Sequence, residues 1–436
     1  MVLRPAFPAE ELARNRTERL TSLAQQHDQP RAIASVLTSK TLFGTAHPYG
    51  RPGIGNEAGL RSITVDDLRA FHASWYQPNN GFIVVSGDVK GTDIVAKLER
   101  LFGSWPRGGA VPPVVPVAQQ VAERRIYLAD KPGAAQSEIR VGCIGVARLT
   151  EDYFPLLVLN TILGGAFTSR LNQNLREEHG YSYGAGSMFD FRPTPGPFLA
   201  YAAVQTNVTD SAVIEFMKEI RGILKPVPDE ELTRAKNNLA LSYPRDFGSV
   251  AQVTGQLAEL ATYGLPDETF NSYIQKVLSV TKDDVQRVAK KYLDLDKMNL
   301  VIVGDRAVIE DVTVTGGRTV VSATNAAGRP KAWLKTPPIA APAANITPHV
   351  LPNSAFAWRS SSGLLARLGT PASIAGRTNA AIAEMVPWKT KSGHTRCTMP
   401  ARRPSAASVC RPLITMSKRR RSNRSTTEPA NGLARN

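Results

Sequence analysis

Two stretches of this chain, SITVDDLRAFHASWYQPNNGFIVVSGD (residues 62–88) and SVTKDDVQRVAKKYLDLDKMNLVIVGD (residues 279–305), align without a gap at an offset of 217 residues. Self-similarity at a fixed offset indicates that one supersecondary unit occurs twice. With 436 residues, the chain is long enough for several domains, each with its own core. We therefore expect two similar subdomains in tandem.

Each copy carries the same helix-start signal. Thr64 is followed three residues later by Asp67, and Thr281 by Asp284, which is the spacing of a capping box. In the first copy, apolar side chains recur at i, i+3 and i+7 and predict a buried stripe: Leu68, Phe71 and Trp75. The short apolar runs GFIVVSGD and NLVIVGD then predict buried strands that stop at Gly-Asp.

The regions around the two copies predict the domain organisation. Residues 106–120 are rich in Pro and Gly, as in an interdomain linker. Residues 121–310 contain four strand-like runs before long amphipathic helices, which predicts a complete subdomain with an antiparallel sheet and helices packed on it. Residues 1–105 contain only the helices and the closing strand, so the first subdomain is expected to be N-terminally truncated relative to its twin. The predicted fold class is α+β.

The strong positive charge is confined to the end of the chain. From Lys331 onward there are 17 Lys and Arg against two acids, whereas the first 330 residues carry 36 against 35. Residues 311–436 lack periodicity and bury too little apolar surface to offset chain entropy, so we expect a disordered basic tail. A nucleic-acid role would predict salt-sensitive binding that is lost on deleting residues 331–436, but no aromatic interleaving accompanies the basic run, and nucleic acid is not an expected partner.

Cysteines and hydropathy add little. Cys143 stands alone in the body, and Cys397 and Cys410 lie in the tail, which is neither a disulfide framework nor a metal cluster. No apolar run reaches the ~18–20 residues of a membrane span, and the N-terminus has no apolar signal region. Membrane is therefore not an expected partner, and the compartment stays undetermined.

The stretch LREEHGYSYG (residues 175–184) raises the question of a zinc site. Its first five residues end in Glu178-His179, as the zinc-binding motif His-x-x-Glu-His does, but Leu175 stands where that motif has its first histidine ligand. No two of the six histidines are three or four residues apart, so no helix presents an imidazole pair to one ion. We expect no metal ligand here, interpret His179 as a solvated helix end, and interpret Ser169 in GGAFTSRL as a helix start because the nucleophile elbow is absent.

Arg176 and Tyr183 are the other candidate site residues. An arginine at a helix end and a tyrosine on the next strand, joined through Gly180, are placed to point into one groove. Arginine offers a charged donor fork for a carbonyl or carboxylate, and tyrosine a rigid ring with a hydroxyl. From residue chemistry alone, a surface arginine and a half-buried tyrosine are the simpler interpretation.

These motifs together resemble the insulinase or pitrilysin family of zinc peptidases, also called inverzincins. HPYGRPGIG (47–55), the repeat at 62–88 and LNTILGGAFTSRLNQNLREEHGYSYGAGS (159–187) carry the resemblance, which runs from about Phe7 to about Arg306. It implies halves of two similar α+β subdomains. A catalytic half binds zinc through His-x-x-Glu-His and a distal Glu, and a metal-free half holds the substrate peptide with an Arg and a Tyr seven residues apart. Arg176 and Tyr183 match that pair.

The departures from the family pattern imply that this chain is the metal-free kind. The chain starts after the place of His-x-x-Glu-His, and the distal Glu, counted back from Asp28-Gln29-Pro30, falls on Thr21 or Ser22, with Glu18 out of register. The resemblance thus implies no catalytic residue and no cofactor in this chain, a peptide substrate, and zinc in a partner peptidase half. Two alternatives stay open: an active zinc metalloendopeptidase whose metal-binding segment lies upstream, and a structural scaffold subunit without proteolysis.

Overall fold

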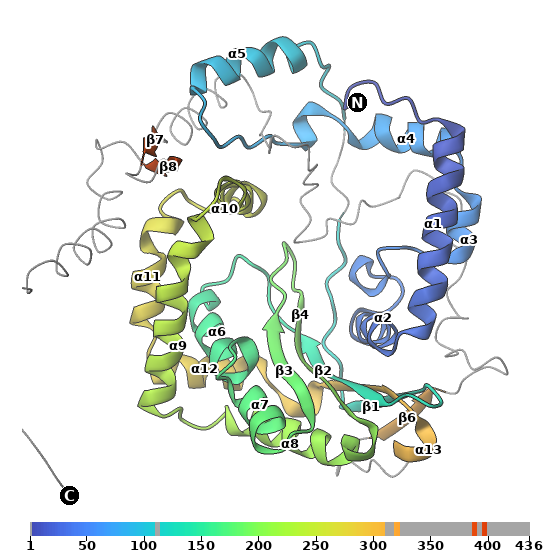
Figure 1. Cartoon of the computed structure of the whole chain (residues 1–436), viewed down its shortest axis with the longest axis vertical. Helices are drawn as coiled ribbons and strands as arrows, with labels where there is room; N and C mark the ends of the chain where they lie inside the picture. Colours follow the sequence, from blue (N-terminus) through green and yellow to red (C-terminus); the bar gives the residue numbers. More distant parts are fainter. Residues whose placement is uncertain (1, 110–113, 310–317, 323–385, 390–394, 399–436) are drawn as a thin grey trace, which may run out of the picture.

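The computed structural model in Figure 1 describes residues 2–109, 114–309, 318–322, 386–389 and 395–398. Its centre is a six-stranded sheet in the order β3-β4-β2-β5-β1-β6. Helices of the second unit, residues 121–310, pack on one face of this sheet, and a helix of the first unit, residues 1–105, packs on the other (Figure 1). The predicted α+β class is confirmed.

The sheet is mixed in direction. β3, β4, β2 and β5 are antiparallel neighbours, as expected, whereas β1 runs parallel to both β5 and β6. The chain between β1 and β5 contains β2, β3, β4 and several helices, so it is long enough for the crossover that a parallel pair requires. The strands are β1 (Arg125–Asp130), β2 (Gln136–Ile144), β3 (Ser182–Phe189), β4 (Pro197–Gln205), β5 (Asn299–Gly304) and β6 (Arg318–Ser322).

The main core lies between this sheet and the second-unit helices. Alternate residues of β2, namely Ile139, Val141 and Cys143, are at most 1% exposed and face these helices, as the two-residue period of a strand requires. Phe198 of β4 and Phe216 are fully buried beside them. The helices are α6 (Tyr153–Asn160), α7 (Arg170–Asn172), α8 (Thr209–Gly222), α9 (Asp229–Ser242), α10 (Val250–Tyr263), α11 (Thr269–Ser279), α12 (Lys282–Tyr292) and α13 (Arg306–Ile309).

The opposite face of the sheet is covered by α2 of the first unit. Ile33, Ala34 and Leu37 pack against Ala129 of β1 and against Val301 and Val303 of β5. The two units therefore share one sheet rather than each enclosing a separate core. The first-unit helices are α1 (Ala9–Asp28), α2 (Pro30–Phe43), α3 (Glu57–Ser62), α4 (Val65–Trp75) and α5 (Gly91–Phe102).

The helix starts predicted from the repeat are confirmed in both copies. Complete capping boxes, with both reciprocal hydrogen bonds, open α4 at Thr64 and α12 at Thr281. Helices α2 and α10, which precede the two copies, also both end at a glycine with positive φ, 72° at Gly44 and 63° at Gly264. Gly264 is in the left-handed helical conformation and its N–H donates to the carbonyl of Leu260, and a helix end of this kind favours glycine.

The strand predicted in the first copy is wrong. The second copy forms β5, whose six residues are all buried between β2 and β1. Residues 82–85 make only single bridges and no strand, and no named strand in the described part of the chain pairs with them. The buried stripe predicted on α4 is also wrong, since Leu68, Phe71 and Trp75 are only half-buried. An apolar strand needs neighbours on both sides before it can be buried.

The second half of the predicted linker is held in place. The side-chain amide of Gln120 bonds both the N–H and the C=O of Ile144, at 3.1 and 3.0 Å, and Nε2 of His47 lies 3.0 Å from the carbonyl oxygen of Pro116. The predicted disordered tail lies mostly outside the described residues. Within it the structure describes β6, which extends the sheet beyond residue 310, and a hairpin of β7 (Val386–Lys389) and β8 (Thr395–Thr398).

One helical stretch, Tyr153–Glu178, is long and apolar enough to cross a membrane by length and composition alone, contrary to the expectation from the sequence. In the fold it lies against the sheet, with Leu156, Leu159 and Leu163 fully buried. Packing in the core accounts for its apolar composition.

Candidate functional site

The candidate residues lie on the segment that connects α6 to β3. After α6 the chain forms a π-helical turn, η3 (Thr161–Gly165), and after α7 a second one, η4 (Gln173–Glu178). The break predicted at GGAFTSRL is confirmed, and α7 starts after Ser169 as expected. π-Helical turns are rare and occur frequently at functional sites, and here Arg176 belongs to the second one.

Gly164 lets the first π-helical turn lie directly on β3. A Cβ atom at this position would be 2.2 Å from the backbone nitrogen of Ser187, a distance that no side chain permits. The turn therefore packs against the backbone of β3 at Gly186 and Ser187, and β3 is the edge strand of the sheet.

Arg176 and Tyr183 lie close together in the structure. The Cζ atom of Arg176 lies 5.1 Å from the centre of the Tyr183 ring and 4.7 Å from that of Phe167, both within cation–π range. Its Nε is 3.3 Å from an Oε1 of Glu177. Tyr183 is 88% exposed and Phe167 62%, so the ring of Tyr183 is not half-buried and the guanidinium lies beside two solvent-facing rings.

Gly180 is the reason that these two side chains meet. Its φ of 65° is left-handed, and its N–H donates to the carbonyl of Arg176 at 3.1 Å while that of Tyr181 donates to Leu175 at 2.9 Å. This is a glycine C-terminal motif, which ends the helix and reverses the chain. The end of η4 and the start of β3 consequently lie side by side.

A bulge at the start of β3 directs Tyr183 outward. The pairing of β3 with β4 shifts register between Ser182 and Ala185. The Ser182 hydroxyl donates to the carbonyl of Gly184 at 2.7 Å and accepts from its N–H at 3.1 Å, which stabilises the irregular backbone. Bulges commonly re-aim a side chain next to functional sites.

Asn172 connects the two sides of the site from below. It is 4% exposed; its Nδ2 donates to the carbonyl of Phe167 at 2.7 Å, and its Oδ1 accepts from the N–H of Ala185 at 3.3 Å. The sequence analysis missed both Asn172 and Phe167. The only signal for Phe167 was an aromatic residue two positions after the Gly164-Gly165 helix break.

His179, which suggested a metal, takes part in a protein network instead. It caps η4, stacks on Tyr181 at 4.9 Å and lies 3.8 Å from an oxygen of Glu215. Burial would raise the pKa of Glu215, but hydrogen bonds from Lys218 and Asn174 outweigh it and lower that pKa. No group of three or more His, Cys, Asp or Glu side chains that fits a metal ion occurs among the described residues, so we derive no step through zinc for this chain.

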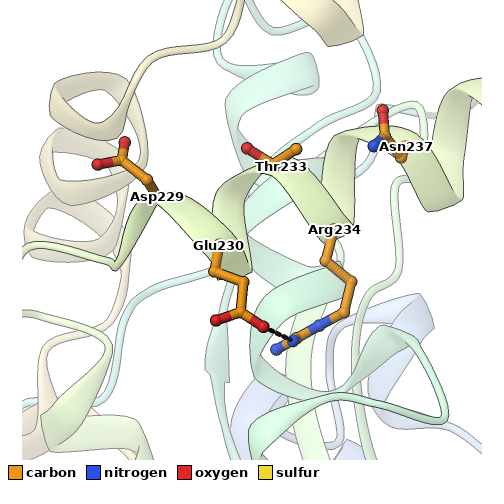
Figure 2. A pocket seen from close by; sticks show the side chains of 5 residues that line it. All are labelled: Asp229, Glu230, Thr233, Arg234 and Asn237. Atoms are coloured by element: carbon orange, nitrogen blue, oxygen red, sulfur yellow. Dashed lines mark hydrogen bonds and ion pairs between the residues drawn. The ribbon is translucent and has the colours of Figure 1, made fainter.

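Surface pockets lie away from this cluster. Figure 2 shows one that is lined by five exposed side chains from a single face of α9, with Arg234 paired to Glu230 at 3.5 Å. Side chains from one helix face do not converge on a ligand, so this is a solvated surface. A second cavity, of about 820 Å³, lies between the linker at Gln120 and the end of α12. Neither is lined by Arg176 or Tyr183.

Comparison with known proteins identifies the class of fold first. The structure superposes on the crystal structure of a peptidase M16 inactive domain from Pseudomonas fluorescens with a TM-score of 0.64, at 29% identity, covering 70% of this chain and 73% of that one. The first half of the periplasmic protease PqqL from Escherichia coli shares the fold at 16% identity, with a TM-score of 0.56 over 71% of this chain and 69% of that one.

The sequence comparisons give the family. Residues 62–239 match the family model described as the peptidase M16 inactive domain. A protein named as an uncharacterized zinc protease from Streptomyces coelicolor is 27% identical over 286 residues, which cover 63% of this chain and 61% of that protein. Residues 62–239 of this chain are thus similar to the inactive domain of the M16 peptidases, which confirms the resemblance to that family. The chain spans about three fifths of the length of that relative.

Proposed function

We propose that this chain is the non-catalytic half of a zinc metallopeptidase, which binds the peptide substrate through Arg176 and Tyr183 and completes a proteolytic chamber with a zinc-bearing half. The observation that carries the proposal is the meeting of these two side chains, 5.1 Å apart from Cζ to ring centre, on an exposed surface. Their contribution is positioning of the peptide, which is a large part of catalysis even without chemistry on the chain itself.

The geometry suits an extended peptide backbone. The guanidinium has five N–H donors, and among the described residues its one ion-pair partner is Glu177 at 3.3 Å, which leaves donors for a carbonyl or a terminal carboxylate. The Tyr183 hydroxyl extends from a ring that is 88% exposed.

The comparisons support a role beside a second half. The matched model describes an inactive domain, and relatives carry the name zinc protease. In PqqL the shared fold covers only 36% of the whole chain, so that protease extends well beyond one such unit. Zinc would come from the partner half, consistent with the lack of a fitting ligand group among the residues described here.

Peptide binding by the purified full chain tests the proposal. We expect Arg176→Ala to weaken binding of fluorescein-labelled peptides about 10- to 100-fold in fluorescence anisotropy, since a charge-assisted hydrogen bond contributes about 1.5–3 kcal/mol. Tyr183→Phe should weaken it less. The matched control for Arg176→Ala is Arg234→Ala on the solvated face of α9. The matched control for Tyr183→Phe is Tyr76→Phe, because Tyr76 is also exposed, at 38%.

A reconstitution assay tests the second half of the proposal. Mixing the chain with a zinc-bearing M16 half from the same organism should produce peptidase activity that neither protein has alone, and Arg176→Ala should raise KM. Unchanged peptide binding in both site variants would contradict substrate holding and favour the scaffold role. Zinc and activity in the chain alone would favour the active-enzyme alternative.

A further inference from the structure

We infer that Phe167 is a third substrate-contacting residue, and that it makes the site select peptides with a bulky apolar side chain next to the backbone group held by Arg176. The inference rests on the proposed function, because it assigns a specificity to the same site. The observation behind it is the position of the Phe167 ring, whose centre lies 4.7 Å from the Cζ of Arg176.

The exposure of Phe167 is the first argument. Phenylalanine is among the residues most often fully buried, yet this one is 62% exposed directly beside a guanidinium. Phe167 and Tyr183 thus place two solvent-facing aromatic rings beside one charged group. An apolar surface next to a fixed polar group is the composition of a ligand-binding site rather than of an ordinary solvated surface.

The arrangement of the two rings around Arg176 is the second argument. Because both rings lie over the guanidinium carbon, an acceptor approaches through the N–H groups at the edge of the planar fork. Those N–H groups fix where a peptide carbonyl or carboxylate lies. The peptide side chain next to that group then reaches the Phe167 ring. Because this ring has no polar atom, an apolar side chain is the one that gains from the contact.

The rigid support of Phe167 is the third argument. Its carbonyl accepts the 2.7 Å hydrogen bond from Nδ2 of Asn172, whose Oδ1 is bonded to the backbone of β3. Since Asn172 is 4% exposed, this connection is shielded from water. It holds the Phe167 loop and the Tyr183 strand at a fixed separation, so little ordering cost remains when a peptide binds. Asn172 is thus a positioning residue for the apolar contact.

A pair of peptides that differ at one position tests the inference. Two fluorescein-labelled nonapeptides of equal charge are compared, one with Phe and one with Ser at the central position. The wild-type chain should bind the Phe peptide about tenfold more tightly, as expected for burying one large apolar side chain. Phe167→Ala should reduce this preference to less than about twofold, and Phe167→Leu should retain most of it.

The variant Asn172→Asp tests the positioning role separately. It keeps the acceptor for the Ala185 N–H and removes the donor to the Phe167 carbonyl. We expect the preference for the Phe peptide to fall to an intermediate value while binding of the Ser peptide is unchanged, which a general loss of folding would not produce. Ile214→Ala, at an apolar residue of α8 that is 61% exposed, is the control and should keep the tenfold preference.

The outcomes separate this inference from the proposed function. Arg176→Ala should weaken both peptides by the same factor. If Phe167→Ala keeps the full preference while Arg176→Ala still weakens binding, the specificity role of Phe167 is refuted and the proposed function stands. If the wild-type chain binds neither peptide, or if Arg176→Ala and Tyr183→Phe bind both as tightly as the wild type, the proposed function itself is refuted.

Discussion

Replacing Asp152 by Asn should remove a pH-dependent part of the stability. The carboxylate lies just before α6 and is 8% exposed. It accepts hydrogen bonds from Arg287 at 2.6 Å, Lys291 at 2.8 Å and the Tyr292 hydroxyl at 2.6 Å, all on α12. One side chain therefore connects the helix that leads into the candidate site with the helix of the repeat.

The size of the effect follows from the pKa of Asp152. Burial alone would raise it, but the hydrogen bonds from Lys291, Tyr292 and Arg287 outweigh burial and lower the pKa from 3.8 to about 2. One pKa unit corresponds to about 1.36 kcal/mol, so the charged form contributes about 2 kcal/mol at neutral pH. Because the side chains of Arg287 and Lys291 are 50% and 56% exposed, water screens part of their attraction.

Urea unfolding followed by circular dichroism at pH 7, 5, 4 and 3 measures this contribution. The folded pKa is below the unfolded one, so the contribution is complete above about pH 4, is about halved at pH 3 and is lost near pH 2. Asp152→Asn should lower the free energy of unfolding by about 2 kcal/mol at pH 7 and by about 1 kcal/mol at pH 3. The control Asp229→Asn removes an exposed pair with Lys282 and should cost under about 0.5 kcal/mol. A difference between Asp152→Asn and wild type that is equal at pH 7 and pH 3 would refute the reasoning.

Three further predictions concern other parts of the fold. Arg148→Met should lower the free energy of unfolding in urea by about 3 kcal/mol. The buried guanidinium contacts Glu259 at 3.0 Å and the Tyr153 ring at 3.7 Å, and its loss leaves Glu259 without this partner. A decrease below about 1 kcal/mol would contradict this prediction. Gly164→Ala should prevent folding or lower the melting temperature strongly, since its Cβ would lie 2.2 Å from the Ser187 nitrogen, whereas Gly255→Ala in α10, where a Cβ meets nothing within 4 Å, should be neutral or stabilising by up to about 1 kcal/mol. Burial lowers the pKa of His47 and the charge of Arg192 lowers it further, whereas the hydrogen bond to Pro116 raises it, and the net shift is downward. The unfolded chain therefore binds a proton at His47 at a higher pH than the folded chain does. The free energy of unfolding should fall as the pH drops below about 6.5 in the wild type but not in His47→Gln.

The sequence predicts helices better than it predicts burial in this protein. The capping boxes at Thr64 and Thr281 form from residues three positions apart, so both copies show them whatever lies nearby. The strand of the repeat is different, because β5 needs β2 and β1 on its two sides, and residues 82–85 have no strand beside them in the described part of the chain. Equal local patterns therefore give equal helices and unequal strands.

The candidate site shows the same division between local and non-local causes. The spacing of Arg176 and Tyr183 was visible in the sequence because the reversal between them depends on one residue, Gly180, and its left-handed backbone. The role of Phe167 was not visible in the sequence. Its ring lies beside Arg176 only because two π-helical turns and the hydrogen bonds of Asn172 hold its loop next to β3. π-Helical turns have no composition signal as clear as a cap or a heptad. Each of these turns still has to pack on the rest of the fold, and the first one does so through a specific contact, the bare backbone of Gly164 against Ser187. A site built this way is fixed by packing several residues distant from the side chains that it presents, and substitutions at Gly164 or Asn172 should alter peptide recognition without touching the peptide.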